Sequence, residues 1–112
     1  MSLSSEKVGD VLVLAPAGQI NSGNAAAVES ELLAKLEQGE SRLVLDLARL
    51  DYISSAGLRV VLMLAKRIKE RAGALVVCGM QPHVREVFDI SGFLAILTVT
   101  DDRNAALAKL AA

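Results

Sequence analysis

Apolar residues form two kinds of pattern along the chain. Nearly continuous apolar runs at 11–15, 42–47 and 74–80 predict strands, and the last two have the composition of strands that are buried on both faces. Between these runs, segments 24–38 and 55–72 carry apolar residues at helical spacing, so we expect an amphipathic helix in each. Because strands and helices alternate, the pattern predicts an α/β fold.

The N-terminal segment predicts a β-hairpin. Residues 3–8 and the apolar run after them flank Gly9 and Asp10, a pair that suits a two-residue turn. Pro16 has no backbone N–H to donate within a sheet, so we expect the second strand of this hairpin to end by Ala17.

The C-terminal third predicts three further elements. Pro82 suits the first position of a short helix that Gly92 ends. The run 95–99 is a candidate last strand, and Asp101 or Asp102 then caps a short final helix.

These elements predict one α/β domain over residues 1–112, with a small mixed sheet of about four to five strands and about four helices. We expect the first few residues either to be disordered or to be additional to the native chain. Asn21 or Ser22 is available to cap the first helix. A single layer of helices leaves one side of the sheet open, and the N-terminal hairpin is the expected cover.

Composition narrows the possible functions. With a net charge of -1 and a pI of about 5.8, the chain lacks the positive electrostatic field that attracts nucleic acids or anionic membranes. Only 3% of its residues are aromatic, so it also lacks side chains on which bases could stack. Arg59 interrupts the longest apolar segment, and no secretory signal is present, so we expect a cytoplasmic protein. Cys78 is a single cysteine, which we place in the core, and with His83 it forms no metal-ligand set. We expect neither metal nor cofactor.

The segment LDYISSAGLRVVL, residues 50–62, carries the candidate chemistry. Ser54 or Ser55 can cap the following helix and contribute about 1 kcal/mol. The same position suits a phosphate, because free amides and the positive end of the helix dipole favour an anion. Ser55, Arg59, Met63 and Lys66 follow one another on a single helical face, which fits either a partner surface or an ordinary solvated face.

Three segments carry a resemblance to a known family. LVLDLARLDYISSAGLRVVL, GALVVCGMQPHVREVFDISGF and AGQINS resemble the STAS domain family, and within it the stand-alone bacterial anti-sigma factor antagonists. The resemblance implies that Ser55 is phosphorylated by an anti-sigma factor with serine kinase activity, with Ser54 as the second choice. It also implies that a serine phosphatase reverses the modification, and that the chain is not an enzyme. The expected partner-binding residues are Asn21, Ser22, Ser54, Ser55, Gly57, Arg59, Met63 and Lys66.

The sequence departs from the family pattern at a few positions. Ser54 stands where family members often have Asp, and Gln19 and Asn21 stand where an acidic residue is frequent. Arg59 replaces a small residue, and from one helical turn away its guanidinium can reach a phosphate on Ser55.

Two other interpretations compete with this one. The first is an enzyme built on Ser55, His83 and Asp46, but the sequence lacks the Gly-x-Ser-x-Gly elbow of such enzymes. Because a buried carboxylate without partners is costly, we instead expect Asp46 at a strand end, where amides near Ser54 satisfy it and it holds the loop. A non-switching STAS interaction module in a signalling scaffold or transport system is the second alternative. Self-association through Val60 and Leu64, beside Met63, is also open.

Overall fold

The computed structural model describes residues 1–111, and the sequence pattern accounts for most of its elements. The strands are β1 (Ser2–Val8), β2 (Val11–Ile20), β3 (Arg42–Asp46), β4 (Leu50–Ile53), β5 (Ala74–Cys78) and β6 (Val99–Thr100). The helices are α1 (Ala25–Glu37), α2 (Ser55–Glu70), α3 (Pro82–Ile90) and α4 (Arg103–Ala111), with a short 3-10 turn, η1, at Phe93–Ala95.

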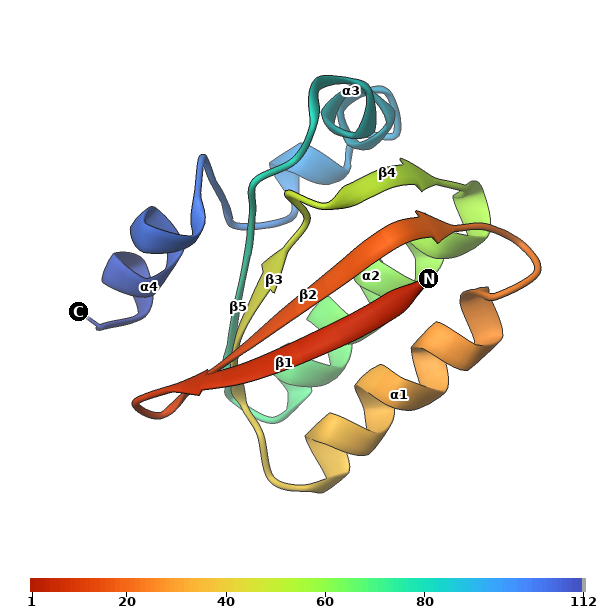
Figure 1. Cartoon of the computed structure of the whole chain (residues 1–112). Helices are drawn as coiled ribbons and strands as arrows, with labels where there is room; N and C mark the ends of the chain where they lie inside the picture. Colours follow the sequence, from red (N-terminus) through yellow and green to blue (C-terminus); the bar gives the residue numbers. More distant parts are fainter. Residues whose placement is uncertain (112) are drawn as a thin grey trace.

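The strands form one mixed sheet with the order β1-β2-β3-β5-β6, of which Figure 1 shows β1, β2, β3 and β5. β1 is antiparallel to β2, whereas β3, β5 and β6 are added in parallel. The predicted α/β class with a mixed sheet is therefore confirmed. Over residues 1–111 the sheet has six strands rather than four to five, because β4 forms within the segment that the sequence pattern assigned to the serine loop.

β2 is longer than predicted, and its two halves have different partners. Leu12–Leu14 pair with β3, whereas Gly18–Ile20 pair with β4 after a register shift at Gly18. Pro16 lies between these two stretches, so its missing N–H removes no bond to β3 or β4. The prediction that this strand ends by Ala17 is wrong, because the proline occupies the gap in which β2 changes partner.

Helices cover both faces of the sheet. The leucines of β2 and β3 face the apolar sides of α1 and α2, and form the larger core with Val84 and Phe88 of α3. The opposite face packs against Ala106 and Leu110 of α4. The hairpin is therefore not the cover that the sequence analysis expected, since β1 lies at the edge of the sheet.

The segment before α4 differs from its prediction. Most of the run 95–99 lies in or after η1, and β6 is confined to Val99 and Thr100. Asp102 begins α4 as predicted, with its carboxylate accepting from the Ala105 amide at 2.8 Å. Of the described residues, none belongs to a helix that is long and apolar enough to cross a membrane.

Cys78 is completely buried in the smaller core, as predicted. Burial, with a further contribution from the carboxylate of Asp46, raises the pKa of its thiol to about 12. The thiolate, which is the reactive form, is therefore scarce at neutral pH, and Cys78 acts as a small apolar side chain.

Candidate functional site

The carboxyl ends of β2 and β4 bring two loops together (Figure 1). Ile20 is paired with Ile53 in parallel register, and the Ser54 amide donates to the Ile20 carbonyl oxygen at 2.8 Å. The loop that begins at Asn21 therefore adjoins the start of α2. Loops at the carboxyl ends of parallel strands are common places for binding sites in α/β proteins.

The loop between β2 and α1 is held by the side chains of two asparagines. Asn21 Oδ1 accepts hydrogen bonds from the amides of Gly23 and Asn24, at 2.9 and 3.1 Å. In return, Asn24 Oδ1 accepts from the Asn21 amide at 2.9 Å, and its Nδ2 donates to the Gln19 carbonyl oxygen. Asn21 thus fixes the loop from a half-buried position, whereas Ser22 is exposed for contact.

Ser54 caps α2. Its Oγ accepts from the Gly57 amide at 3.2 Å, and its carbonyl oxygen accepts from the Leu58 amide at 2.9 Å. The backbone of Ser54 is extended, as is usual for a residue just before the first helical turn. Of the two serines that the sequence offered as caps, Ser54 therefore has this role, and it is half-buried.

Ser55 is the first residue of α2 and is exposed. In the described part of the chain, its hydroxyl makes no hydrogen bond to another protein group. It stands where the first amides of the helix create a positive electrostatic potential. A phosphate attached to this oxygen would extend into solvent at the helix end that favours an anion.

The predicted face of α2 continues from Ser55 on the outside of the helix. Arg59 and Lys66 are exposed, and neither belongs to an ion pair among the described residues. Met63 is half-buried and packs against the larger core. The surface thus carries two free cations, with the edge of a methionine between them.

Val60 and Leu64 are not part of this surface. Their exposed fractions are 6% and 0%, because both pack into the larger core. The sequence interpretation that placed them beside Met63 for self-association is therefore wrong. The apolar side chains of α2 that the structure leaves partly exposed are Ala56, Leu62, Met63 and Ala65.

Gly57 is buried beneath the first turn of α2. A Cβ atom at this position would lie 2.7 Å from Cγ1 of Ile53 and 2.9 Å from Cγ2 of Ile20. Glycine therefore allows the helix to begin directly over the ends of β2 and β4. Gly57 was a predicted partner-binding residue, but its burial gives it a packing role under the site.

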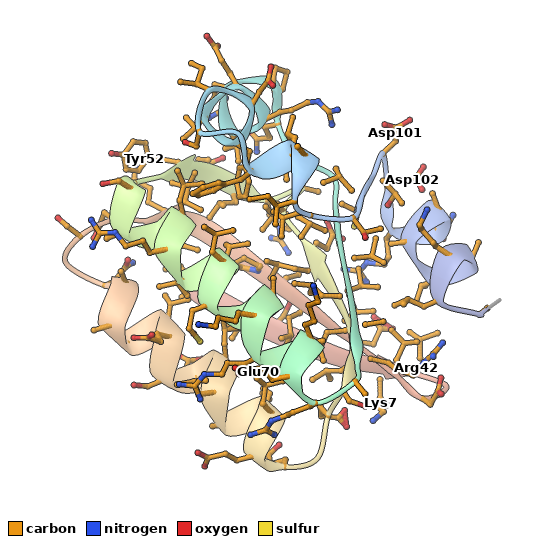
Figure 2. All side chains as sticks on the ribbon, turned by 180° about the vertical axis from the view of Figure 1, so that it is seen from behind. Lys7, Arg42, Tyr52, Glu70, Asp101 and Asp102 are labelled. Carbon is orange, nitrogen blue, oxygen red and sulfur yellow. The ribbon has the colours of Figure 1, made fainter. Side chains whose placement is uncertain are left out.

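Tyr52 is a residue of this region that the sequence analysis missed. It lies on β4 beside Gln19, three residues before Ser55, and 47% of it is exposed (Figure 2). No signal in the sequence marked its exposure, because strict strand alternation would put Tyr52 on the same face as the buried Leu50. Exposed aromatic residues are enriched in protein interfaces.

Comparison with known proteins places this architecture in a family. The model of the STAS domain matches residues 2–106. The chain belongs to the STAS domain family. It is 54% identical over 108 residues to a protein of Bordetella bronchiseptica named "Putative anti-sigma factor antagonist BtrV", and the match spans 96% of this chain and 93% of the relative.

Solved structures share the fold of this STAS domain. A crystal structure from Thermotoga maritima, described as a putative anti-sigma factor antagonist, superimposes with a TM-score of 0.94 at 22% identity, covering 98% of this chain and 95% of that one. The Bacillus cell fate determinant SpoIIAA in its phosphorylated form gives a TM-score of 0.74 at 19% identity, with coverages of 97% and 99%. At these identities, the likeness establishes the fold.

Asp46 supports a different loop of the STAS domain from the one predicted. Its Oδ1 accepts from the Ala48 amide at 3.0 Å, and its Oδ2 forms an ion pair with Nε of Arg103 at 2.9 Å. The carboxylate is thus satisfied on the α4 side of the sheet, not by amides near Ser54. It fixes the turn after β3 and ties α4 to the sheet.

The three residues of the enzyme hypothesis are not bonded to one another. His83 is exposed in the first turn of α3, and its Nε2 contacts the carbonyl oxygen of Asp51. Asp46 is bound to Arg103, and Ser55 is not bonded to either. Residues 1–111 contain no group of three or more His, Cys, Asp or Glu side chains placed to hold a metal ion. The match to the STAS family and to a relative named as an anti-sigma factor antagonist supports the prediction that the chain is not an enzyme.

Proposed function

We propose that this STAS domain is an anti-sigma factor antagonist that works by partner switching. Unphosphorylated, it binds an anti-sigma factor and so frees the sigma factor; phosphorylation of Ser55 ends the binding. The observation that carries the proposal is that two adjacent serines differ in their hydrogen bonding. Ser54 Oγ is engaged by the Gly57 amide, whereas the exposed Ser55 hydroxyl is free at the first helical position.

The partners follow from the chemistry of such a switch. The anti-sigma factor has serine kinase activity and modifies Ser55, and a serine phosphatase restores the hydroxyl. All of these proteins meet in the cytoplasm. The name of the 54% identical relative supports an anti-sigma factor as the binding partner.

The local structure explains why one phosphate can switch binding without unfolding the domain. A phosphoserine adds about -1.5 to -2 charges at pH 7, and the N-terminus of α2 tolerates this charge. An interface that covers Ser55 would instead have to bury the phosphate. Burying an unpaired charge in an interface costs about 2–5 kcal/mol, which corresponds to a loss of roughly 30-fold or more in affinity.

The binding surface that we propose combines both loops and the outer face of α2. Ser22, Tyr52 and Ser55 lie at the strand ends, and Arg59, Met63 and Lys66 continue along the helix. Asn21, Ser54 and Gly57 lie beneath or beside this surface and hold its shape. A partner therefore meets a preformed surface with free hydroxyl and cationic groups.

The test compares Ser55→Asp with Ser54→Asp and the wild type, in calorimetric titrations with the anti-sigma factor of the native host. We expect Ser55→Asp to weaken binding by roughly 30-fold or more, with a native circular dichroism spectrum. In parallel, phosphopeptide mass spectrometry of the protein from its host should find phosphate on Ser55. Binding of the Ser55→Asp variant with wild-type affinity would refute the mechanism.

Ser55→Ala is the matched control for this experiment. It should bind the anti-sigma factor like the wild type while it abolishes the phosphopeptide signal. If serines 54 and 55 are both unmodified in the host and a partner stays bound throughout, the domain is a non-switching interaction module.

A further inference from the structure

The edge of the sheet beyond β5 is only partly paired. β6 contacts β5 only at Val77 and Cys78, and the Val77 amide donates to the Thr98 carbonyl oxygen at 2.9 Å. On the other side, Ala74 and Cys78 bond with the chain at β3. Since bonding directions alternate along a strand, Leu75 directs its N–H and C=O toward the β6 side, two residues before β6 begins its pairing.

A cavity of about 390 Å³ lies along this open edge. Figure 2 shows β5 between α2 and α4, the two helices that border the cavity. Most of its lining residues are apolar in type, with lysine and backbone polar groups among them, and Ile96 on its rim is 69% exposed. A second hollow shares Ala65, Lys69 and Ile96 with it and continues along α2. We call the two together the β5-edge groove; it is lined by Leu62, Ala65, Lys66, Ile68, Lys69, Gly73, Ala74, Leu75, Val76, Ile96, Leu97, Thr98, Lys109 and Leu110.

The charges of the groove have one sign. Lys66, Lys69 and Lys109 lie on its lining, and no lining residue is acidic. None of these three ammonium groups belongs to an ion pair within residues 1–111. An occupant with carboxylates would therefore gain partners that the folded chain does not supply.

We propose that the β5-edge groove binds an extended segment of a partner protein in which apolar and acidic residues alternate. The backbone of the segment bonds with the N–H and C=O of Leu75 and so extends the sheet at the part of β5 that lies before the start of β6. Its side chains alternate between the α2 side and the α4 side of the sheet, so that carboxylates on the α2 side reach Lys66 and Lys69 while apolar side chains enter the cavity beside Leu110 of α4.

Two other occupants fit the groove less well. An acyl chain would fill the apolar part of the cavity, but it has no donor or acceptor for the backbone groups of Leu75. A second copy of this chain would bring the same three lysines against themselves, and like charges disfavour that contact. The groove combines free backbone groups, apolar side chains and lysines, and a peptide is the occupant that can pair with all three.

The groove is separate from the start of α2 and does not rest on phosphorylation of Ser55. The two surfaces meet only at Lys66, which lies about three turns along α2 from Ser55. A partner on the Ser55 face has the groove beside it, and the same partner or a different one can supply the acidic segment.

The test is a titration of the whole ¹⁵N-labelled protein with a short synthetic peptide of alternating glutamate and leucine, acetylated and amidated at its ends. We expect amide shifts at Leu75, Leu97 and Thr98, with Ser55 unmoved. The double variant Lys66→Glu, Lys69→Glu should bind the peptide roughly tenfold or more weakly. The matched control Arg49→Glu, Arg85→Glu makes the same charge change at exposed sites outside the groove and should bind as the wild type does.

Two further probes complete the test. The same peptide with methylated backbone nitrogens, and a version with lysine in place of glutamate, should each bind roughly tenfold or more weakly. Equal binding of the lysine peptide, or shifts confined to the Ser55 loop, would overturn the proposal. Phosphatidylglycerol vesicles that shift the same amides when the peptide does not would assign the groove to lipid, and a concentration-dependent dimer through these residues would assign it to a second copy.

Discussion

The inner and outer sides of the first turn of α2 carry residues with opposite roles. On the inner side, Ser54 bonds to the Gly57 amide, and Gly57 packs against Ile20 and Ile53. On the outer side, Ser55 and Arg59 are exposed, and neither side chain has a bonded partner in the described chain. Residues next to each other in the first turn thus differ in whether they make contacts that stabilise the folded state.

This difference explains how a structural element can also be a regulatory site. A residue whose polar group is already bonded is costly to modify, because the modification leaves a donor or an acceptor unsatisfied. A residue whose group faces solvent can be modified with little effect on the folded state. The comparison therefore predicts large effects on stability from inner substitutions and small ones from outer substitutions.

The largest effect is expected at Gly57. We expect Gly57→Val to lower the free energy of unfolding by about 3 kcal/mol, because its side chain would overlap Ile20 and Ile53. Urea denaturation followed by circular dichroism measures this loss. Ala27→Val, at an exposed position of α1, is the control and should cost less than about 1 kcal/mol. Equal small losses in both variants would contradict tight packing under the first turn.

The next effect separates the two serines. Ser54→Ala removes the oxygen that accepts from the Gly57 amide, so we expect a loss of about 1 kcal/mol in unfolding free energy. Ser55→Ala removes no bond within the protein and should change stability by less than about 0.5 kcal/mol. The same urea measurement on both proteins decides the point, and a larger loss from Ser55→Ala would reverse the assignment of the cap.

The sequence predicted the elements whose pattern is local. The hairpin at Gly9, the strand before Asp46 and the helix after Ser55 all occupy their expected places, because turn chemistry and apolar spacing act within a few residues. The continuation of β2 past Pro16 was missed, since it depends on a partner strand about thirty residues away, and sequence periodicity contains no such information. β4 was missed for the same reason.

The position of the candidate site in the fold was predicted in outline, but the contacts of its residues were not. The serine segment and the face from Ser55 to Lys66 are where the sequence placed them. Whether Ser54 or Ser55 caps the helix depends on the exact residue at which α2 begins, and the sequence pattern did not determine that residue. The partner of Asp46 is Arg103, 57 residues away, and only the packing of α4 brings them together. Contacts between distant segments were thus the unpredictable part.

A smaller effect is expected for a negative charge at Ser55. We expect Ser55→Asp to leave the unfolding free energy unchanged or to raise it by about 0.3–1 kcal/mol, because the charge lies at the positive end of α2. Ser55→Asn has a similar size without the charge and is the control. The difference between the two variants should shrink as salt is added. A Ser55→Asp variant clearly less stable than Ser55→Asn would show that the outer side also shapes the fold.

The smallest effect concerns Arg59 as a partner for phosphoserine. With phosphoserine incorporated at position 55, the guanidinium one turn away should stabilise the dianion and lower the second pKa of the phosphate. Because the pair is exposed, the coupling should be about 0.3–0.5 kcal/mol, so Arg59→Ala should raise this pKa by roughly 0.2–0.4 units. A ³¹P NMR titration measures the shift.

Lys66→Ala, on the same face but about three turns from residue 55, is the matched control for this titration and should leave the phosphate pKa unchanged. An equal rise in the Arg59→Ala and Lys66→Ala proteins would mean that the phosphate senses the net charge of the helix and has no specific partner. A rise with Arg59→Ala alone would mean that Arg59 favours the phosphorylated state directly. In that case the outer side of α2 supplies both the modified hydroxyl and the cation that receives its phosphate.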